Sequence, residues 1–440
     1  MNKNSLKLQA YQIVKNKILD CEFPPGTLLT ENMLCDMLSL GRTPVRDAVS
    51  RLEQEHFVRI FPPKGIVVED ITLADLSDLF EARLIFEPYI ISEYGKNIEV
   101  SEYREFKSRF PDPAVSSSSN EFFRIMSSLH SLLYQSSQNP YLIQFYDQYR
   151  YQEQRLHSLI PISSGQMGGL FNLYQKLIDS CIQNCWDNAS DILPAVLKSY
   201  RDILFEDALA CLKPSRPPAA KKARTYGKNN LKQQAYQIIR QKIINCEYLP
   251  GALLNGSLLE EAVPGSQTPV RDALSRLEQE KLVTILPKKG VLVAQLTVGD
   301  LKPVYETRLL LEPYVILHYG NKLSEDFYMD MYNNFSAAAP LQPDGSHYTF
   351  DDEFHLSLIQ AADNSYISQV YEQIHAQTHR VRVLCGNTAE NRVTDSMKEH
   401  LEIILPCLKK DWDEASAGMA DHLTRSRGSV LKNLSQRTFL

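Results

Sequence analysis

The amino-acid sequence predicts a mainly α-helical chain in which one two-domain unit occurs twice. Three observations support this fold class. Identical segments recur at a constant spacing along the 440 residues. Most of each repeat shows apolar residues at helical spacing and few glycines, which favours amphipathic helices. A short β-rich stretch follows the first helices of the repeat and predicts one small hairpin.

The repeats have the length of whole domains. TPVRDA occurs at Thr43–Ala48 and at Thr268–Ala273, and SRLEQE occurs at Ser50–Glu55 and at Ser275–Glu280. The offset is 225 residues (268 − 43), and it becomes 226 at the pair Trp186 and Trp412. A solenoid would repeat every 20–50 residues or so, and the pattern therefore indicates duplication of a complete unit.

Composition limits the classes of function. Apolar residues make up 43% and charged residues 23% of the chain, and the net charge is −6. Any affinity for nucleic acid must therefore come from local basic patches. The eight cysteines form no C-x-x-C pair, which favours reduced thiols. The polar start MNKNSLKLQA and the lack of a long apolar run predict no signal peptide, no membrane span and a cytoplasmic, nucleoid-associated protein.

The repeat and a change in composition set the expected domain boundaries. The segment Leu212–Asn230 holds three prolines, six basic residues and no acid, which is typical of an exposed linker. Its Lys221, Lys222 and Arg224 either are simply solvated or contact phosphate. The expected domains are residues 1–70, 71–212, 231–296 and 297–440, with a linker at 213–230.

Each repeat begins with a predicted three-helix module and a hairpin. Helical spacing covers Lys7–Leu19, a short helix is expected at about Glu31–Leu38, and a third starts at Thr43-Pro44, with Thr43 as its N-cap. The run FVRIFPPKGIVVED at Phe57–Asp70 predicts a hairpin with a basic tip. Three helices and such a hairpin make a winged helix-turn-helix, whose third helix enters the DNA major groove.

The segment RTPVRDAVSRLEQEHFV, with the PPG turn before it and the P-P-K-G turn after it, resembles the DNA-binding domain of the GntR family. The resemblance implies operator contacts by Arg42, Thr43, Arg46, Lys64 and Gly65. Arginine suits bidentate recognition of guanine, or phosphate contact.

The second copy keeps Thr268, Arg271, Lys289 and Gly290, but Gln267 replaces Arg42. Glutamine favours adenine in bidentate geometry, and we therefore expect an asymmetric operator. Pro264-Gly265 should also reshape the end of the preceding helix.

The remainder of each repeat resembles the helical effector domain called FCD, an antiparallel bundle. In the second copy Asp351 and His355 stand four residues apart, and His400 and His422 follow. These four residues match the ligands of metal-binding FCD domains, which implies a divalent ion such as Zn²⁺, Ni²⁺ or Mn²⁺. Arg308 matches an arginine that faces the effector, and its guanidinium suits a carboxylate.

In the first copy the same four positions hold Met126, His130, Tyr174 and Val196. One ligand of four cannot form a chelate, and we expect this copy to bind no metal. Binding of an apolar ligand through Arg83 remains open.

The resemblance implies a regulator, most often a repressor, that binds a double-stranded DNA operator, responds to a small organic acid and is not an enzyme. The duplicated units would form a single-chain pseudo-dimer, with further oligomerisation open. Two alternatives remain: a ligand-blind architectural DNA binder, and a metal-dependent hydrolase. The sequence leaves open the effector, the operator and whether the protein represses or activates.

Overall fold

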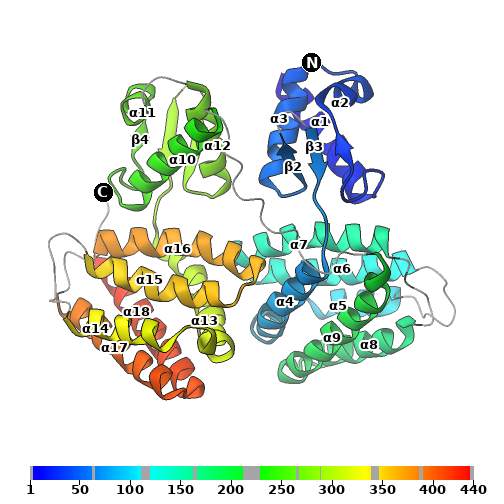
Figure 1. Cartoon of the computed structure of the whole chain (residues 1–440). Helices are drawn as coiled ribbons and strands as arrows, with labels where there is room; N and C mark the ends of the chain where they lie inside the picture. Colours follow the sequence, from blue (N-terminus) through cyan, green and yellow to red (C-terminus); the bar gives the residue numbers. More distant parts are fainter. Residues whose placement is uncertain are drawn as a thin grey trace. The chain divides into compact units, whose positions relative to one another are not determined.

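The computed structural model describes residues 3–61, 65–110, 119–160, 162, 166–211, 228–263, 267–287, 289–337, 346–385 and 390–436. The chain divides into two compact units, Met1–Ala219 and Ala220–Leu440. Figure 1 shows that each unit holds a small mixed domain and a larger helical domain. The predicted fold class is confirmed.

The small domain of unit 1 contains three helices and a three-stranded sheet. Its elements are α1 (Lys3–Leu19), β1 (Leu28–Leu29), α2 (Glu31–Leu38), α3 (Arg42–Gln54), β2 (Val58–Phe61) and β3 (Gly65–Val68). Unit 2 repeats them as α10 (Lys228–Ile244), β4 (Leu253–Leu254), α11 (Gly256–Ala262), α12 (Gln267–Gln279), β5 (Val283–Leu286) and β6 (Gly290–Val293). In both sheets the third strand lies centrally and pairs antiparallel with the other two. This is the expected winged helix-turn-helix.

Local chemistry fixes the turn between α2 and α3. The side chain of Thr30 accepts a hydrogen bond from the backbone N–H of Met33 and caps the start of α2. Ser39 ends that helix in the left-handed conformation, with φ 53°. The sequence prediction for the next helix was wrong in one detail: α3 begins at Arg42, and Gly41, not Thr43, is its N-cap. Arg42 therefore belongs to the first turn of the recognition helix.

The central strand of the sheet begins with a glycine for a steric reason. Gly65 has φ +129°, and a Cβ there would lie 2.8 Å from the carbonyl oxygen of Leu29. Gly290 repeats this, with φ +124° and 2.6 Å to the carbonyl oxygen of Leu254. Only glycine fits this conformation and this close approach of β3 to β1.

The helical domains are bundles. Unit 1 contains α4 (Leu73–Tyr94), α5 (Val100–Arg109), α6 (Ser119–Ser136), α7 (Pro140–Leu159), α8 (Met167–Ile182) and α9 (Trp186–Cys211). Unit 2 contains α13 (Val298–Tyr319), α14 (Glu325–Ala337), α15 (Ser346–Ala361), α16 (Ser365–Cys385), α17 (Glu390–Lys409) and α18 (Trp412–Gln436). A one-turn 3₁₀ helix follows the first helix of each bundle, at Gly95–Asn97 and Gly320–Lys322. Both bundles begin at a capping box, Thr72 with Asp75 and Thr297 with Asp300.

A buried arginine connects the small domain to the bundle within each unit. Arg155 on α7 donates to the carbonyl oxygen of Glu69 at 2.6 Å, and its own carbonyl accepts from the Cys21 thiol. Arg380 on α16 makes the same contacts with Ala294 and Cys246. Both arginines have 0% exposure. Because a buried guanidinium needs its acceptors, these bonds fix the last strand of the sheet against the bundle.

Among the residues that the structure describes, no helix has the length and apolar character that a bilayer crossing requires. Six cysteines whose side chains are described are free thiols: Cys21, Cys35, Cys181, Cys185, Cys246 and Cys407.

Candidate metal centre and nucleic-acid interface

The start of helix α3 presents the predicted DNA-contacting side chains of unit 1. Arg42, Thr43 and Arg46 are all exposed. Arg46 forms a two-pronged ion pair with Glu31 on α2, with 2.9 Å from Nε to each carboxylate oxygen. Nη2 of Arg42 donates weakly to Asn32, at 3.4 Å. Exposed ion pairs contribute little to stability, and DNA phosphate or a guanine edge can replace Glu31 at small cost.

Unit 2 presents this surface differently. Arg271 on α12 is exposed, but Gly256 occupies the position that Glu31 has in unit 1. No carboxylate among the described residues pairs with Arg271. Gln267 and Thr268 lie in the first turn of α12, although their side chains lie outside the described residues. The arginines of the two recognition helices therefore differ in their partners as well as in number.

The turns of the wings are partly described. Gly65 and Gly290 begin the central strands, and the side chain of Lys289 is exposed at the tip of its hairpin. Lys64, Pro264-Gly265 and the linker basic residues Lys221, Lys222 and Arg224 lie outside the described residues.

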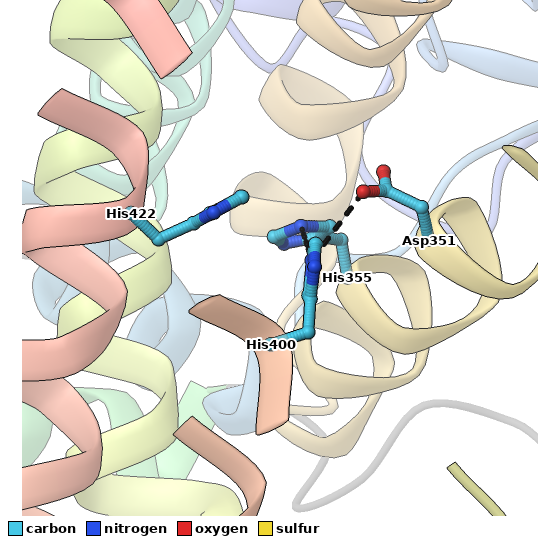
Figure 2. A group of neighbouring side chains, drawn as sticks. All are labelled: Asp351, His355, His400 and His422. Carbon is cyan, nitrogen blue, oxygen red and sulfur yellow. Dashed lines mark hydrogen bonds and ion pairs between the residues drawn. The ribbon is translucent and has the colours of Figure 1, made fainter. Parts of the chain in front are cut away.

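The four predicted metal ligands of unit 2 come together inside its helical bundle. Asp351 and His355 extend from α15, His400 from α17 and His422 from α18, and Figure 2 shows them facing one another. One ligand atom from each residue lies within 4.8 Å of the others. Nε2 of His355 lies 3.1 Å from Nε2 of His400, which in turn lies 3.3 Å from Oδ1 of Asp351. Residues 71 positions apart (422 − 351) thus converge on one point.

Each histidine of this group has an acceptor behind its ring. Nδ1 of His355 lies 2.6 Å from Glu312, and Nδ1 of His400 donates to the carbonyl oxygen of Ser396 at 2.7 Å. Nδ1 of His422 donates to Glu399 at 2.8 Å. An acceptor at Nδ1 selects the tautomer whose lone pair is on Nε2, the atom that faces the group. These acceptors therefore orient all three rings so that Nε2 of each faces the group, the arrangement that a shared cation would require.

Electrostatics support the same conclusion. Burial lowers the pKa of His400 to about 4 and lowers the pKa of His422 well below its usual value, and both rings are therefore neutral at pH 7. Burial alone would raise the pKa of Asp351, but the nearby Arg382 and His400 hold it well below its usual value, so the carboxylate is ionised. Three lone pairs and a carboxylate facing one another repel unless a cation lies among them.

Arg308, the predicted effector residue, lies beside this group. Its guanidinium is 2% exposed and forms an ion pair with Glu312, one turn further along α13. Glu312 also accepts from Tyr371 at 3.2 Å and lies behind His355. The same carboxylate thus holds both the arginine and a candidate ligand.

A chain of ion pairs leads from Asp351 towards the small domain of unit 2. Arg382 on α16 contacts both Asp351 and Asp352. Asp352 accepts from Nδ1 of His379 at 2.7 Å, and Nε2 of His379 lies 3.2 Å from Oδ1 of Asn245, directly after α10. The sequence interpretation missed Arg382, Asp352 and His379. The 225-residue alignment could have pointed to them, because unit 1 has His157, Ser127 and Gln154 there.

In unit 1 the phenol of Tyr174 takes the place of His400. His130 is 1% exposed; its Nε2 lies 2.7 Å from the hydroxyl of Tyr174, and its Nδ1 lies 2.9 Å from Glu87. Met126 and Val196, at the other two positions, are apolar and fully buried. His130 is therefore a core histidine with a partner on each nitrogen. Arg83, which the sequence left open as a ligand-binding residue, pairs with Glu87 and Glu153.

Comparison with known proteins agrees with this architecture. The family described as bacterial regulatory proteins, gntR family, matches residues 6–68 and 231–293. The FCD domain family matches residues 78–199 and 303–425.

Curated relatives correspond to about half of the chain. The HTH-type transcriptional repressor RspR of Escherichia coli (strain K12) is 25% identical over 201 residues, which cover 45% of this chain and 88% of RspR. The repressor GlaR of the same strain is 23% identical over 198 residues, 43% of this chain and 90% of GlaR. A solved GntR regulator from Rhodococcus sp. RHA1 is 18% identical, with a TM-score of 0.40. The match covers 46% of this chain and 98% of the Rhodococcus chain. One unit of this chain is thus similar to nearly the whole length of RspR or of GlaR.

The four-residue group predicts one divalent ion per chain. After loading with Zn²⁺, Ni²⁺ or Mn²⁺ and desalting, elemental analysis should find about one equivalent per chain, and His400→Ala should abolish it because two nitrogens and one carboxylate hold an ion far more weakly. His318→Ala, which changes an exposed histidine, is the control and should keep the ion. Two equivalents would contradict the interpretation of unit 1, and none would remove the metal site.

A second prediction concerns pH and the core of unit 1. Burial, and then Arg83, lower the pKa of His157 to about 3, and its Nε2 lies 2.7 Å from the Tyr200 hydroxyl. Because the unfolded chain binds this proton below about pH 6.5 and the folded unit does not, stability should fall as the pH drops from 6.5 towards 3. Between pH 7 and pH 5 the loss should be about 2 kcal/mol.

His157→Gln should remove that loss. Urea unfolding followed by Trp186 fluorescence in a Trp412→Phe background isolates unit 1, because the chain has only these two tryptophans. Equal pH dependence with and without His157 would show that another group titrates.

Proposed function

The chain belongs to the GntR family of bacterial regulatory proteins and carries its FCD domain twice, and we propose that it is a repressor that binds one pseudo-palindromic operator with its two winged helices. The sensing site is the second FCD domain, where a divalent ion binds at Asp351, His355, His400 and His422. A small organic acid completes the coordination of that ion and pairs with Arg308. The observation that carries this proposal is the convergence of four ligand atoms within 4.8 Å, each histidine with an acceptor behind it.

The chemistry of the site suits a carboxylate effector. If the ion prefers six ligands, the four protein ligands would leave room for oxygen ligands, and the nearby guanidinium of Arg308 would favour an anionic one. When bound, the ion supplies a positive charge that attracts the carboxylate. The side chains of this chain supply the second contact, the orientation and the exclusion of water.

A purely architectural role and a hydrolase explain fewer of these features. A ligand-blind DNA binder would have no use for four converging ligands in one unit. A hydrolase needs a general base beside the ion, and the two acids nearest the histidines, Glu312 and Glu399, already hold Arg308 and Arg392 as well as imidazole nitrogens. We therefore prefer sensing to catalysis.

We further propose that the ion pairs from Asp351 to Asn245 couple the site to DNA binding. An effector changes an equilibrium only by the difference in its affinity for the two states. Arg382 interacts with a ligand of the ion on one side and with Asp352 on the other. Because Arg382 pairs with both Asp351 and Asp352, an ion held by Asp351 would compete with Arg382 for that carboxylate and so strengthen the pairing of Arg382 with Asp352. Asp352 would transmit the change through His379 to Asn245 of the small domain.

This coupling can be tested without loss of the ion. In the metal-loaded chain, lactate, malate and citrate are screened by fluorescence anisotropy for a change in operator affinity, with an expected effect of roughly 5-fold or more for an active acid. A chelator or His400→Ala should abolish the effect. Asp352→Asn should retain one equivalent of metal and reduce the effect to less than half, because Asp352 is not a ligand but connects Arg382 to His379.

The control for that variant is Ser127→Ala, the same position in unit 1, which should leave the response unchanged. An unchanged response in Asp352→Asn would eliminate the ion-pair route. A DNA affinity that no carboxylate and no chelator alters would eliminate the sensing function.

The two recognition helices predict different half-sites. Selection of binding sequences from a random pool should give one half with guanine and the other with adenine at the positions read by Arg42 and Gln267. Gln267→Arg should make the selected operator more symmetric, with guanine in both halves. Arg42→Gln should also make it more symmetric, with adenine in both halves. Arg46→Ala should weaken binding about tenfold, because it removes one charged contact to phosphate or guanine. A symmetric operator that Gln267→Arg leaves unchanged would contradict this assignment.

A further inference from the structure

The two bundles surround their central arginines with different numbers of carboxylates. In unit 1, Nε and Nη2 of Arg83 donate to Glu87 at 2.7 and 3.5 Å, and Nη1 donates to Glu153 at 3.0 Å. The guanidinium has 0% exposure, and the side chain of Glu153 is 5% exposed. Two acids from two helices, α4 and α7, thus enclose one cation.

In unit 2 only the first of these two acids is present. Nε and Nη2 of Arg308 donate to Glu312, as in unit 1. Thr378 stands where Glu153 stands, and its hydroxyl donates to the carbonyl oxygen of Ile374 at 2.9 Å. Within the described residues, no carboxylate contacts Nη1 of Arg308, whereas Nη1 of Arg83 has Glu153 as its partner. A guanidinium that lacks one of its carboxylate partners can bind a free carboxylate there.

The alignment of these positions rests on identical contacts two residues further along. Arg155 and Arg380 each bond a glutamine three residues before them and the carbonyl that follows the wing. Glu153 and Thr378 are therefore the same position of the same helix.

Other replacements around the arginine agree with this difference. The hydroxyl of Tyr200 in unit 1 bonds His157, and Tyr200 also interacts with Glu153. Ser426 takes the place of Tyr200 in unit 2 and bonds Tyr305 at 2.9 Å. Unit 2 thus lacks the second carboxylate of unit 1, and the phenol beside its arginine comes from Tyr305 on α13 and not from the counterpart of α9. Glu87, which binds Arg83, also contacts Nδ1 of His130. Nε2 of His130 contacts the Tyr174 hydroxyl, where the equivalent atom in unit 2 would contact the ion.

We propose that unit 1 is a self-liganded effector domain, in which the Glu153 carboxylate occupies the place that a free carboxylate takes on Nη1 of Arg308 in unit 2. Unit 1 is then held permanently in the arrangement that unit 2 adopts only when its effector is bound. The carboxylate position on Arg308 rests on the proposed function, whereas the enclosure of Arg83 by Glu153 does not. The consequence is a regulator with one responsive half and one fixed half.

The first experiment replaces the internal carboxylate and offers a free one. Glu153→Thr introduces the residue of unit 2, and it should lower the melting temperature of unit 1 by about 6 °C or more, because one partner of a buried ion pair is lost. In chelator and without DNA, 0.1 M sodium acetate should recover about 3 °C of this loss relative to sodium chloride at equal ionic strength. Followed by Trp186 fluorescence in a Trp412→Phe background, unit 1 should show no such recovery with wild-type Glu153 or with Glu153→Gln, which fills the site with an amide.

Glu105→Ala, which breaks the exposed ion pair with Arg109, is the matched control for loss of an acid and should show neither effect. Equal acetate effects on unit 1 in Glu153→Thr and in the wild type would overturn the proposal. Because this experiment involves neither the ion nor DNA, its outcome does not depend on the sensing function.

The second experiment transfers the carboxylate to unit 2. Thr378→Glu should raise the melting temperature of metal-free unit 2 and should reduce its stabilisation by acetate at least threefold, since Nη1 of Arg308 then has an internal partner. The metal-loaded variant should show the operator affinity of the effector-bound wild type with no acid added. A destabilised Thr378→Glu chain that still responds fully to acetate would overturn the proposal even if Glu153→Thr did not fold.

Discussion

Each bundle is organised around one buried ion pair, between an arginine and the glutamate one turn later on the first helix. The guanidiniums of Arg83 and Arg308 are at most 2% exposed, and such a charge persists only when opposite charge and hydrogen bonds surround it. Burial alone would raise the pKa of Glu312, but the positive charge of Arg308 keeps that pKa well below its usual value. The glutamate therefore stays ionised and can fix the ring of His355.

The duplicated chain keeps this pair in both units and changes what surrounds it. In unit 2 the glutamate lies behind one of four converging ligand atoms, whereas in unit 1 the same glutamate and Tyr174 enclose a single histidine. Once two units are covalently linked, each can diverge while the other retains its contribution, and binding of the second module to DNA becomes intramolecular. The loss of three ligands in unit 1 therefore need not abolish DNA binding.

The junction between the small domain and the bundle shows where the two units can differ in response. The Arg155 and Arg380 contacts are the same in both, and they fix the strand that leaves the wing. Beside this junction, unit 2 has an ion-paired route through Arg382, Asp352 and His379, whereas unit 1 has a hydrogen bond from Gln154 to Asp20 at 3.2 Å. The contact in unit 1 is a hydrogen bond from an amide to a carboxylate and no ion pair, whereas under the proposed function the ion pairs of unit 2 would respond to a cation at Asp351.

The sequence alone determined the duplication, the helical class and the winged hairpin, because repeats, periodicity and residue types can be read directly from a chain. The four candidate ligands followed from the resemblance to metal-binding FCD domains. The sequence analysis placed the N-cap of α3 at Thr43 and missed Gly41, because glycine and threonine both suit an N-cap and only the backbone conformation shows which one fills it. The acceptors behind the histidines, the enclosure of Arg83 by Glu153 and the route from Arg382 to Asn245 depended on the tertiary structure. Apart from the bond of His400 to Ser396 within α17, these contacts join residues that lie between 23 and 134 positions apart. Pairing over such separations depends on how the helices pack, which no local pattern specifies.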